Sequence, residues 1–201
     1  MRSPLHLPDH HGPCVVWFTG LSGAGKTTIA KLVEADLVAR GRRVFVLDGD
    51  ALRAGLCRDL SFSASDRSEN LRRAAEVAAL VASEGFIVLA AFITPRQEDR
   101  DRIRSRFATQ AFMEVFVDTP LDVAERRDPK GLYRRARLGQ ISNFTGIDSP
   151  FDPPTLADLR LDTVANAAVD LAKTVVRTIL ATRGFATSAS APMPPVTAQQ
   201  K

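Results

Sequence analysis

The sequence has few cysteines and no long apolar run, and each shortage narrows the possible functions. Its two cysteines, Cys14 and Cys57, do not have the spacing of metal ligands, and we interpret both as reduced thiols. No stretch approaches the length of a membrane-spanning helix, and the first residues lack the apolar core of a signal peptide. We therefore expect a cytoplasmic protein that has no membrane partner.

Histidine is also scarce, and all three histidines (His6, His10 and His11) precede the first apolar run. A metal site there would need further ligands nearby, so we interpret residues 1–12 as a flexible leader. If the protein uses a general base, that base should be a carboxylate rather than an imidazole. The net charge of +4 is too small to indicate nucleic-acid binding, and we expect no nucleic-acid partner.

The strongest pattern is a glycine-rich segment, residues 20–27, with the spacing G-x-x-x-x-G-K-T. An apolar strand is predicted before it at 14–18 and an amphipathic helix after it at 28–40, which is the P-loop arrangement. Backbone N–H groups of such a loop point at phosphates, and Lys26 adds positive charge to the β- and γ-phosphates. The predicted ATP-binding residues are Gly20, Leu21, Ser22, Gly23, Ala24, Gly25, Lys26, Thr27 and Thr28.

Strands and helices continue to alternate over residues 13–184, which predicts a single α/β domain. We expect a doubly wound, mainly parallel sheet with helices on both faces. The tail over residues 185–201 has a composition typical of disorder. The expected elements are buried strands at 43–47, 86–93 and 112–118, a short strand at 159–162, an irregular segment at 51–66, and helices from 66 to 84, 94 to 109, 121 onward and 164 to 183.

Capping patterns in the sequence predict where three of the helices begin. Asp66 is expected to begin a helix with Glu69 as its capping-box partner. Thr94 is expected to be the N-cap of the following helix, and Thr119 to cap the next one in the same way. The helix after Thr94 is dense in arginine and aspartate, so we expect its outer face to be solvated.

Polar residues follow the second strand and begin the third helix. Asp48 and Asp50 come directly after a strand, and the carboxyl ends of parallel strands form the ligand crevice of such sheets. We therefore expect both acids to face the P-loop. Arg67 and Asn70 lie about one helical turn apart, so they can present a guanidinium and an amide to one ligand.

Basic residues crowd segment 126–146, which is interrupted by Pro129, Gly131 and Gly139. A solvated basic helix is one interpretation. We favour an arginine-rich lid over phosphates, because kinases exclude water and neutralise the charge of the γ-phosphate. The basic residues are Arg126, Arg127, Lys130, Arg134, Arg135 and Arg137.

Two other classes of P-loop protein fit less well. The N-K-x-D signature of a guanine-specific GTPase is missing, and no apolar strand ends in the acid pair typical of a mechanical ATPase. The pattern suits a small-molecule kinase and leaves the acceptor open.

Several motifs resemble those of the adenylyl-sulfate (APS) kinase family. The resemblance spans residues 15–161 and implies transfer of the γ-phosphate of ATP to the 3′-hydroxyl of adenosine 5′-phosphosulfate, giving PAPS and ADP, the activation step of sulfate assimilation. The matching motifs are the P-loop, Asp48-Gly49-Asp50 with Arg53, segment 59–63, Asp66-Arg67 with Asn70, Ile93-Thr94-Pro95, segment 127–133 and segment 144–147.

The resemblance implies residue roles. Lys26, Asp48 and Asp50 are the expected catalytic residues, and Thr27 with Asp48 would hold the Mg²⁺ cofactor. Thr94 matches a family serine described as a phosphorylated intermediate, but its role as a helix cap leads us to predict direct transfer. Phe62 and Phe144 are expected to sandwich the adenine, with Phe151 as a further candidate. The implied APS-binding residues are Asp50, Arg53, Phe62, Arg67, Asn70, Ile93, Thr94, Lys130, Gly131, Leu132 and Phe144.

The sequence departs from the family pattern at several positions, and three alternatives stay open. They are a degenerate or regulatory member of the family, a kinase for another nucleotide or small alcohol, and a nucleotide-binding partner of a sulfurylase without turnover. For an active kinase we expect ATP and APS as substrates, a homodimer and an association with ATP sulfurylase. The departures are Ala51 for Asn, Ser61 for Gly, Thr94 for Ser, Arg96-Gln97 for Tyr-Arg and Phe151-Asp152 for Tyr-Glu.

Overall fold

A computed structural model describes residues 15–181 of the chain. The leader at 1–12, the tail at 185–201, Cys14 and the histidines lie outside the described residues. Within 15–181, no helix is both long enough and apolar enough to cross a membrane. The elements are β1 (Val15–Thr19), α1 (Lys26–Ala39), β2 (Val44–Asp48), α2 (Gly49–Ala54), α3 (Ala64–Ser83), β3 (Ile87–Ala91), α4 (Gln97–Arg104), the 3₁₀ turn η1 (Thr109–Ala111), β4 (Phe112–Asp118), α5 (Leu121–Arg127), α6 (Leu132–Arg137), β5 (Leu159–Asp162) and α7 (Ala168–Ala181).

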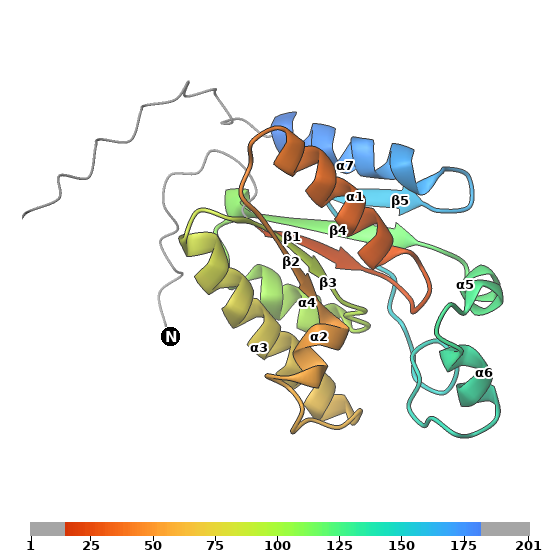
Figure 1. The fold of residues 1–201 in the computed structure, drawn as a ribbon. Coiled ribbons are helices and arrows are strands. Elements are labelled where there is room, and N and C mark those ends of the chain that lie inside the picture. The colour runs from red at the N-terminus through yellow and green to blue at the C-terminus, as the bar shows by residue number, and fades with distance from the viewer. Residues whose placement is uncertain (1–14, 182–201) are drawn as a thin grey trace, which may run out of the picture.

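The five strands form one sheet in the order β2-β3-β1-β4-β5, and every neighbouring pair is parallel (Figure 1). On the central strand, Val16 lies opposite Leu89 of β3 and Met113 of β4. Parallel neighbours need crossover connections, and the helices between the strands provide them. The predicted doubly wound α/β fold is confirmed.

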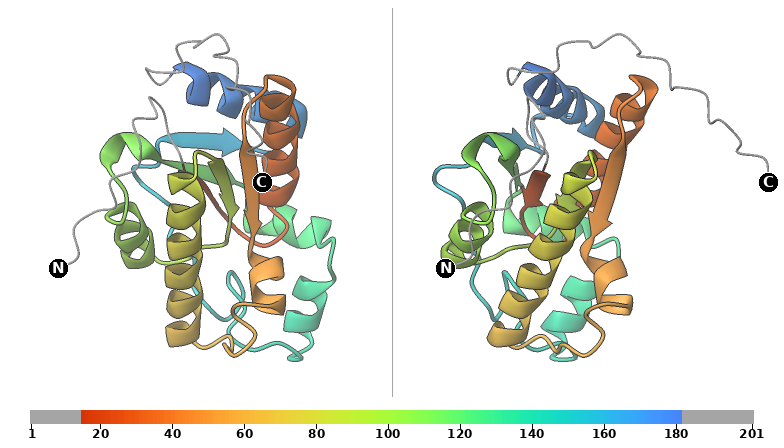
Figure 2. Two further views of the ribbon diagram at one scale, coloured as in Figure 1. Left: turned by 60° about the vertical axis from the view of Figure 1, so that its left-hand side comes forward. Right: turned by 90° about the vertical axis from the view of Figure 1, so that its left-hand side faces the viewer.

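Two apolar layers enclose the sheet. Helices α1 and α7 cover one face, and α3 and α4 cover the other (Figures 1 and 2). Val16 and Phe18 of β1 pack toward α1 and α7, whereas Val15 and Trp17 belong to the cluster with α3 and α4. This alternation is expected, because successive side chains of a strand point to opposite faces of the sheet.

Strand β2 differs from its prediction as a buried strand. It is an edge strand of the sheet, and Leu47 is its only buried residue. Phe45 is 40% exposed. The apolar run alone could not reveal this, because edge and central strands of a parallel sheet have similar composition.

Two predicted features of helix α3 are wrong. The helix begins at Ala64, and its N-cap is Ser63, whose hydroxyl accepts a hydrogen bond from the Asp66 N–H at 3.1 Å. Glu69 forms ion pairs with Arg72 and Arg73 instead of a capping box. Residues 51–66 are also more regular than predicted, since they contain most of α2 and the start of α3.

Neither Thr94 nor Thr119 caps a helix. Helix α4 begins at Gln97, and the backbone of Thr94 has a positive φ of 44°. The Thr94 hydroxyl accepts a hydrogen bond from Trp17 Nε1, and the Thr119 hydroxyl bonds to Thr163 Oγ1. Both threonines are buried, so contacts distant in sequence took precedence over local capping.

Two helices, α4 and α7, begin or end differently from their predictions. Helix α4 ends at Arg104 rather than near residue 109, and α7 begins at Ala168 rather than at 164. The outer face of α4 is exposed as predicted, but two of its charged residues, Asp99 and Arg100, are buried.

Gly20 ends β1 where the chain passes close to β4. Its φ is +146°, and an added Cβ would lie 2.5 Å from the carbonyl oxygen of Val117.

We expect Gly20→Ala to lower the free energy of unfolding by about 2–4 kcal/mol, since backbone strain adds to the steric overlap. Gly41→Ala is the control. Its φ is +74° with no atom within 4 Å of an added Cβ, so it should cost about 1 kcal/mol. Equal losses in urea denaturation would contradict the steric explanation.

Candidate active site

The P-loop joins β1 to α1 and folds around its own lysine. Gly25, in a left-handed conformation with φ of 105°, precedes the first helical residue, Lys26. Lys26 Nζ donates hydrogen bonds to the carbonyl oxygens of Gly20 at 2.9 Å and Leu21 at 2.7 Å. A phosphate oxygen is a stronger acceptor than a carbonyl, so a nucleotide would compete for this ammonium group.

Burial, together with the nearby charge of Lys130, lowers the pKa of Lys26 to about 7. Asp48 and Asp50 act in the opposite direction. The amine therefore titrates near neutral pH in the absence of a ligand. Phosphates favour its charged form, so their binding should raise this pKa.

Thr27 and Asp48 form the part of the site that suits a cation. The Thr27 hydroxyl donates to Asp48 Oδ2 at 2.8 Å, and Asp48 Oδ1 accepts from the Asp50 N–H at 2.9 Å. A hydroxyl and a carboxylate are oxygen ligands of the kind that Mg²⁺ prefers. Within residues 15–181, no cluster of three or more His, Cys, Asp or Glu residues could hold a metal. Phosphate oxygens and water would have to complete the shell, as is usual for Mg²⁺ bound with nucleotides.

Asp50 and Lys130 connect the two sides of the site. Asp50 lies in the first turn of α2, and Lys130 lies between α5 and α6. Their side chains form an ion pair, and α2 and α6 are neighbours beyond the carboxyl ends of the strands (Figures 1 and 2). The two expected site residues are therefore brought together across 80 positions of sequence.

Tyr133 ties α6 to the P-loop, a role that the sequence reasoning missed. Its hydroxyl donates to the carbonyl oxygen of Ser22 at 3.0 Å, and its ring is buried. Burial raises the pKa of Tyr133 to about 12, so the hydroxyl stays protonated as a donor. Arg127 is anchored separately, because it donates to the Thr163 carbonyl at 2.9 Å. These contacts show how segment 126–146 is attached, and its closure as a lid stays a prediction.

Arginines surround Phe62 on the acceptor side. The guanidinium carbons of Arg53 and Arg67 lie 4.3 Å and 5.7 Å from the centroid of the Phe62 ring, which is 54% exposed. Arg67 donates to the Phe62 carbonyl at 3.0 Å, to Thr145 Oγ1 at 2.9 Å and to the Asn143 carbonyl. Arg67 thus joins the segment of Phe62 to the loop that contains Phe144.

The other two phenylalanines are less available than Phe62. Phe144 is buried and packs edge-on against Tyr133, with ring centroids 4.9 Å apart. Phe151 stacks on Phe116 at 6.1 Å. The structure therefore links Phe62 and Phe144 through Arg67, and their joint contact with an adenine stays a prediction.

Asn70 is buried at the start of α3, and its Oδ1 has no hydrogen-bond partner in the described part of the chain. An unpaired buried acceptor costs about 1–3 kcal/mol, so a donor from a ligand would be favourable there. The remaining predicted residues occupy the same end of the molecule. Ile93 follows β3, Gly131 precedes α6 with a φ of 64°, and Leu132 packs in the small cluster that contains Phe144.

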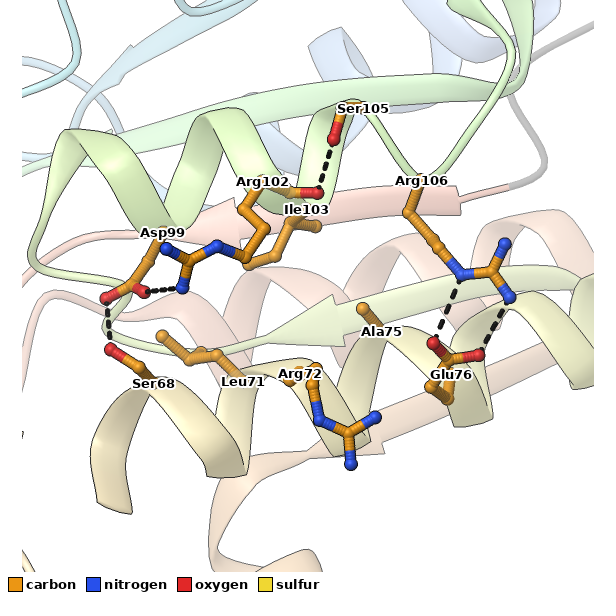
Figure 3. Close-up of a pocket in the computed structure, with 10 residues that line it drawn as sticks. All are labelled: Ser68, Leu71, Arg72, Ala75, Glu76, Asp99, Arg102, Ile103, Ser105 and Arg106. Carbon is orange, nitrogen blue, oxygen red and sulfur yellow. Dashed lines mark hydrogen bonds and ion pairs between the residues drawn. The ribbon is translucent and has the colours of Figure 1, made fainter. Parts of the chain in front are cut away.

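A groove of about 330 Å³ lies between α3 and α4 (Figure 3). Arg106 pairs across it with Glu76 of α3 at 2.8 Å, whereas Arg102 and Asp99, 3.5 Å apart, both belong to α4. None of the predicted site residues lines this groove. A second hollow, of about 680 Å³, is lined by Leu21 of the P-loop together with Leu121 and Phe151. The candidate site is therefore defined by the polar groups around the P-loop rather than by the groove of Figure 3.

The titration of Lys26 gives a testable prediction. The free amine has a pKa of about 7, and bound phosphates should raise it, so nucleotide binding should take up protons between pH 7 and 9. Nucleotide affinity should accordingly fall as pH rises through this range. Calorimetry in buffers of different ionisation enthalpy measures the uptake. Lys26→Arg is the control, because a guanidinium does not titrate there. Equal proton uptake by both proteins would assign it to another group.

Known proteins resemble this chain in both sequence and fold. The family model described as adenylylsulphate kinase matches residues 12–162. An adenylyl-sulfate kinase of Shewanella baltica is 57% identical over 151 residues, which are 75% of this chain and 74% of that protein.

Two solved structures extend the comparison. The APS kinase of Mycobacterium tuberculosis, in complex with AMPPNP and APS, matches with a TM-score of 0.80 and 48% identity over 86% of this chain and 99% of that one. A shikimate kinase of Acinetobacter baumannii shares the fold at a TM-score of 0.56 and 18% identity, over 86% of this chain and 95% of that one. The extent of the family match and the identity to curated relatives show that this chain belongs to the adenylylsulphate kinase family.

Proposed function

We propose that this chain transfers the γ-phosphate of ATP to the 3′-hydroxyl of APS, giving PAPS and ADP. The observation that supports this most directly is the meeting of a P-loop with an arginine-rich acceptor side. Asp48 joins them, since it accepts hydrogen bonds from Thr27 of the P-loop and from the Asp50 N–H of α2, the helix that contains Arg53. A related kinase from M. tuberculosis was solved with an ATP analogue and APS together.

On the donor side, Lys26 neutralises charge on the β- and γ-phosphates as the transfer proceeds. Phosphoryl transfer depends mainly on positioning and on electrostatic stabilisation, so a preformed loop with a held ammonium group suits it. Thr27 and Asp48 would hold Mg²⁺, which supplies charge neutralisation to the phosphates when it is bound.

On the acceptor side, we assign Asp50 to the 3′-hydroxyl of APS. Its carboxylate accepts the hydroxyl proton, a bond forms between O3′ and the γ-phosphorus, and the bond to the β–γ bridging oxygen breaks to release ADP. Lys130 pairs with Asp50 and so orients that carboxylate. No histidine occurs at residues 15–181, which is consistent with a carboxylate base.

APS carries a phosphosulfate and an adenine, and the acceptor side suits both. Arg53 and Arg67 offer planar guanidinium groups that match oxyanions. The exposed ring of Phe62 offers a face for the base, and Asn70 Oδ1 offers an unpaired acceptor. Ile93, Gly131, Leu132 and Phe144 would complete the pocket.

We propose direct transfer rather than a phosphorylated Thr94. The original argument, that Thr94 caps a helix, is wrong, but a different observation supports the same conclusion. Thr94 is 1% exposed, and its hydroxyl already accepts a hydrogen bond from Trp17. A buried hydroxyl in that position is poorly placed to attack a phosphate of ATP.

The cytoplasmic location, the homodimer and the association with ATP sulfurylase stay predictions that rest on the family resemblance. Sedimentation of the purified chain, alone and with a sulfurylase, would test the two assemblies.

The proposed activity is tested by ADP release from Mg·ATP alone, with APS and with AMP. We expect rapid release with APS only. Equal release with AMP and APS would indicate a kinase for another nucleotide, and no release with either would indicate a binding protein without turnover.

Lys26→Ala should lose several orders of magnitude of turnover while its circular-dichroism spectrum stays that of the wild type.

Phe62 provides a test of acceptor recognition. Phe62→Ala should weaken APS binding by about 1–3 kcal/mol, the usual value of a base–aromatic stack, while binding of ATP stays unchanged. Because the ring is 54% exposed, the variant should remain as stable as the wild type. Phe45→Ala is a matched control, since Phe45 is an exposed phenylalanine on the edge strand β2. Unaltered APS affinity in Phe62→Ala would place the adenine elsewhere.

A further inference from the structure

Thr94 has an unusual backbone conformation for its residue type. Its φ is 44°, and β-branched residues seldom adopt a positive φ because of steric strain. Such strain persists only where surrounding contacts impose it, and it is frequent at functional sites. Thr94 directly follows Ile93 at the end of β3, where APS is expected to bind, so the contacts that hold it are of interest.

Arg100 is the main side chain that holds Thr94. From α4, its Nη1 donates to the Thr94 carbonyl oxygen at 2.9 Å, and its Nη2 donates to Gln97 Oε1 at 2.7 Å. On the other side of the residue, Trp17 Nε1 donates to the Thr94 hydroxyl at 2.8 Å. Thr94 is therefore held through both its backbone and its side chain by buried donors.

Glu114 of β4 faces Arg100 inside the protein. Arg100 Nε lies 3.3 Å from Glu114 Oε1, and the two side chains are only 2% and 6% exposed. Glu114 Oε2 is 3.2 Å from Arg104 Nη2. A buried ion pair contributes little net stability, because desolvation offsets the attraction, and an apolar pair of similar volume is often as stable. Stability alone therefore does not explain a charged pair at this position.

The end of β3 is also bonded to the start of the P-loop. The Thr19 hydroxyl donates to the Ile93 carbonyl at 2.6 Å and lies 3.3 Å from the Thr94 carbonyl. The Gly20 N–H donates to the same Ile93 carbonyl at 3.3 Å. Gly20 in turn accepts a hydrogen bond from Lys26. A set of hydrogen bonds thus runs from Arg100, which is ion-paired with Glu114, through the end of β3 to the P-loop.

We propose that Arg100, oriented by Glu114, is a positioning residue that fixes the APS-binding end of β3 relative to the P-loop. Its role is to set the separation of the acceptor hydroxyl from the γ-phosphate without touching either substrate. Transfer rates are sensitive to this separation, and a misplacement of about 1 Å can cost about 100-fold. The inference rests on the proposed function for its kinetic part, while the effect on Thr94 does not.

The test uses Arg100→Met/Glu114→Gln, which removes both charges of the pair and leaves no unpaired buried charge. We expect kcat with APS to fall about 10- to 100-fold, KM for ATP to stay within about threefold, and the thermal midpoint to stay close to that of the wild type. A merely structural role would lower stability without this selective loss of kcat.

Trp17 supplies an independent readout, because it is the only tryptophan in the chain. Its indole donates directly to Thr94, so its fluorescence emission should shift in the double variant. Arg106→Met is the matched control. Arg106 follows α4 closely and forms a partly exposed ion pair with Glu76 in the groove of Figure 3, away from Thr94. It should retain the kcat and the Trp17 emission of the wild type.

A folded double variant with a kcat within twofold of the wild type and unchanged Trp17 emission would overturn the proposal. If the double variant does not fold, Arg100→Lys replaces it. That change keeps a charge beside Glu114, but one ammonium cannot reproduce the fork to Thr94 and Gln97. A drop in kcat of at least fivefold would support the proposal, and an unchanged kcat would overturn it. If the wild type shows no APS-dependent turnover, the proposed function is wrong, and the Trp17 emission alone decides whether Arg100 positions Thr94.

Discussion

The parallel pairing of β1 with both β3 and β4 is the constraint on which the site depends. Because all three strands run in the same direction, their carboxyl ends lie at one edge of the sheet. Gly20 leaves β1 at that edge, close to the Val117 carbonyl on one side and bonded to the Ile93 carbonyl on the other. Any change in strand order would separate the phosphate-binding loop from the residues that are expected to hold the acceptor.

Charge at the site is nearly balanced. Lys26 and Lys130 lie near Asp48 and Asp50, and the influence of all three neighbours on the pKa of Lys26 shows that the four groups are close. Burial lowers the pKa of Lys26 to about 7, so the negative charge of a bound ligand can change the protonation of the amine near neutral pH. A polyanion such as ATP would bind with less repulsion from the two acids, because the ammonium groups of Lys26 and Lys130 lie beside them.

Local patterns in the sequence predicted the parts of this molecule that depend on local physics. The P-loop could be identified from its glycines and from Lys26, and the central strands from their apolar runs. Helix starts were mispredicted at Thr94 because its hydroxyl bonds to Trp17, 77 positions away, and such contacts leave no mark on neighbouring residues. The burial of Arg100 was missed for the same reason, because its partner Glu114 lies on another element, β4. One signal was present: Glu114 is a charged residue in the middle of an apolar strand, and such a residue needs a buried partner.

The two sides of the site differ in how their charges are placed. On the side of β3, Arg100 and Glu114 are buried and ion-paired, and Arg100 also donates to the Thr94 carbonyl, so the core fixes their geometry. On the side of α2 and α6, Asp50 and Lys130 are mostly exposed, and water screens their pairing. An exposed pair can exchange partners when a substrate enters, whereas a buried pair cannot without a large cost. We infer that the residues at the end of β3 keep a fixed position during phosphate transfer, and that the substrate enters between α2 and α6, where the exposed ion pair can separate.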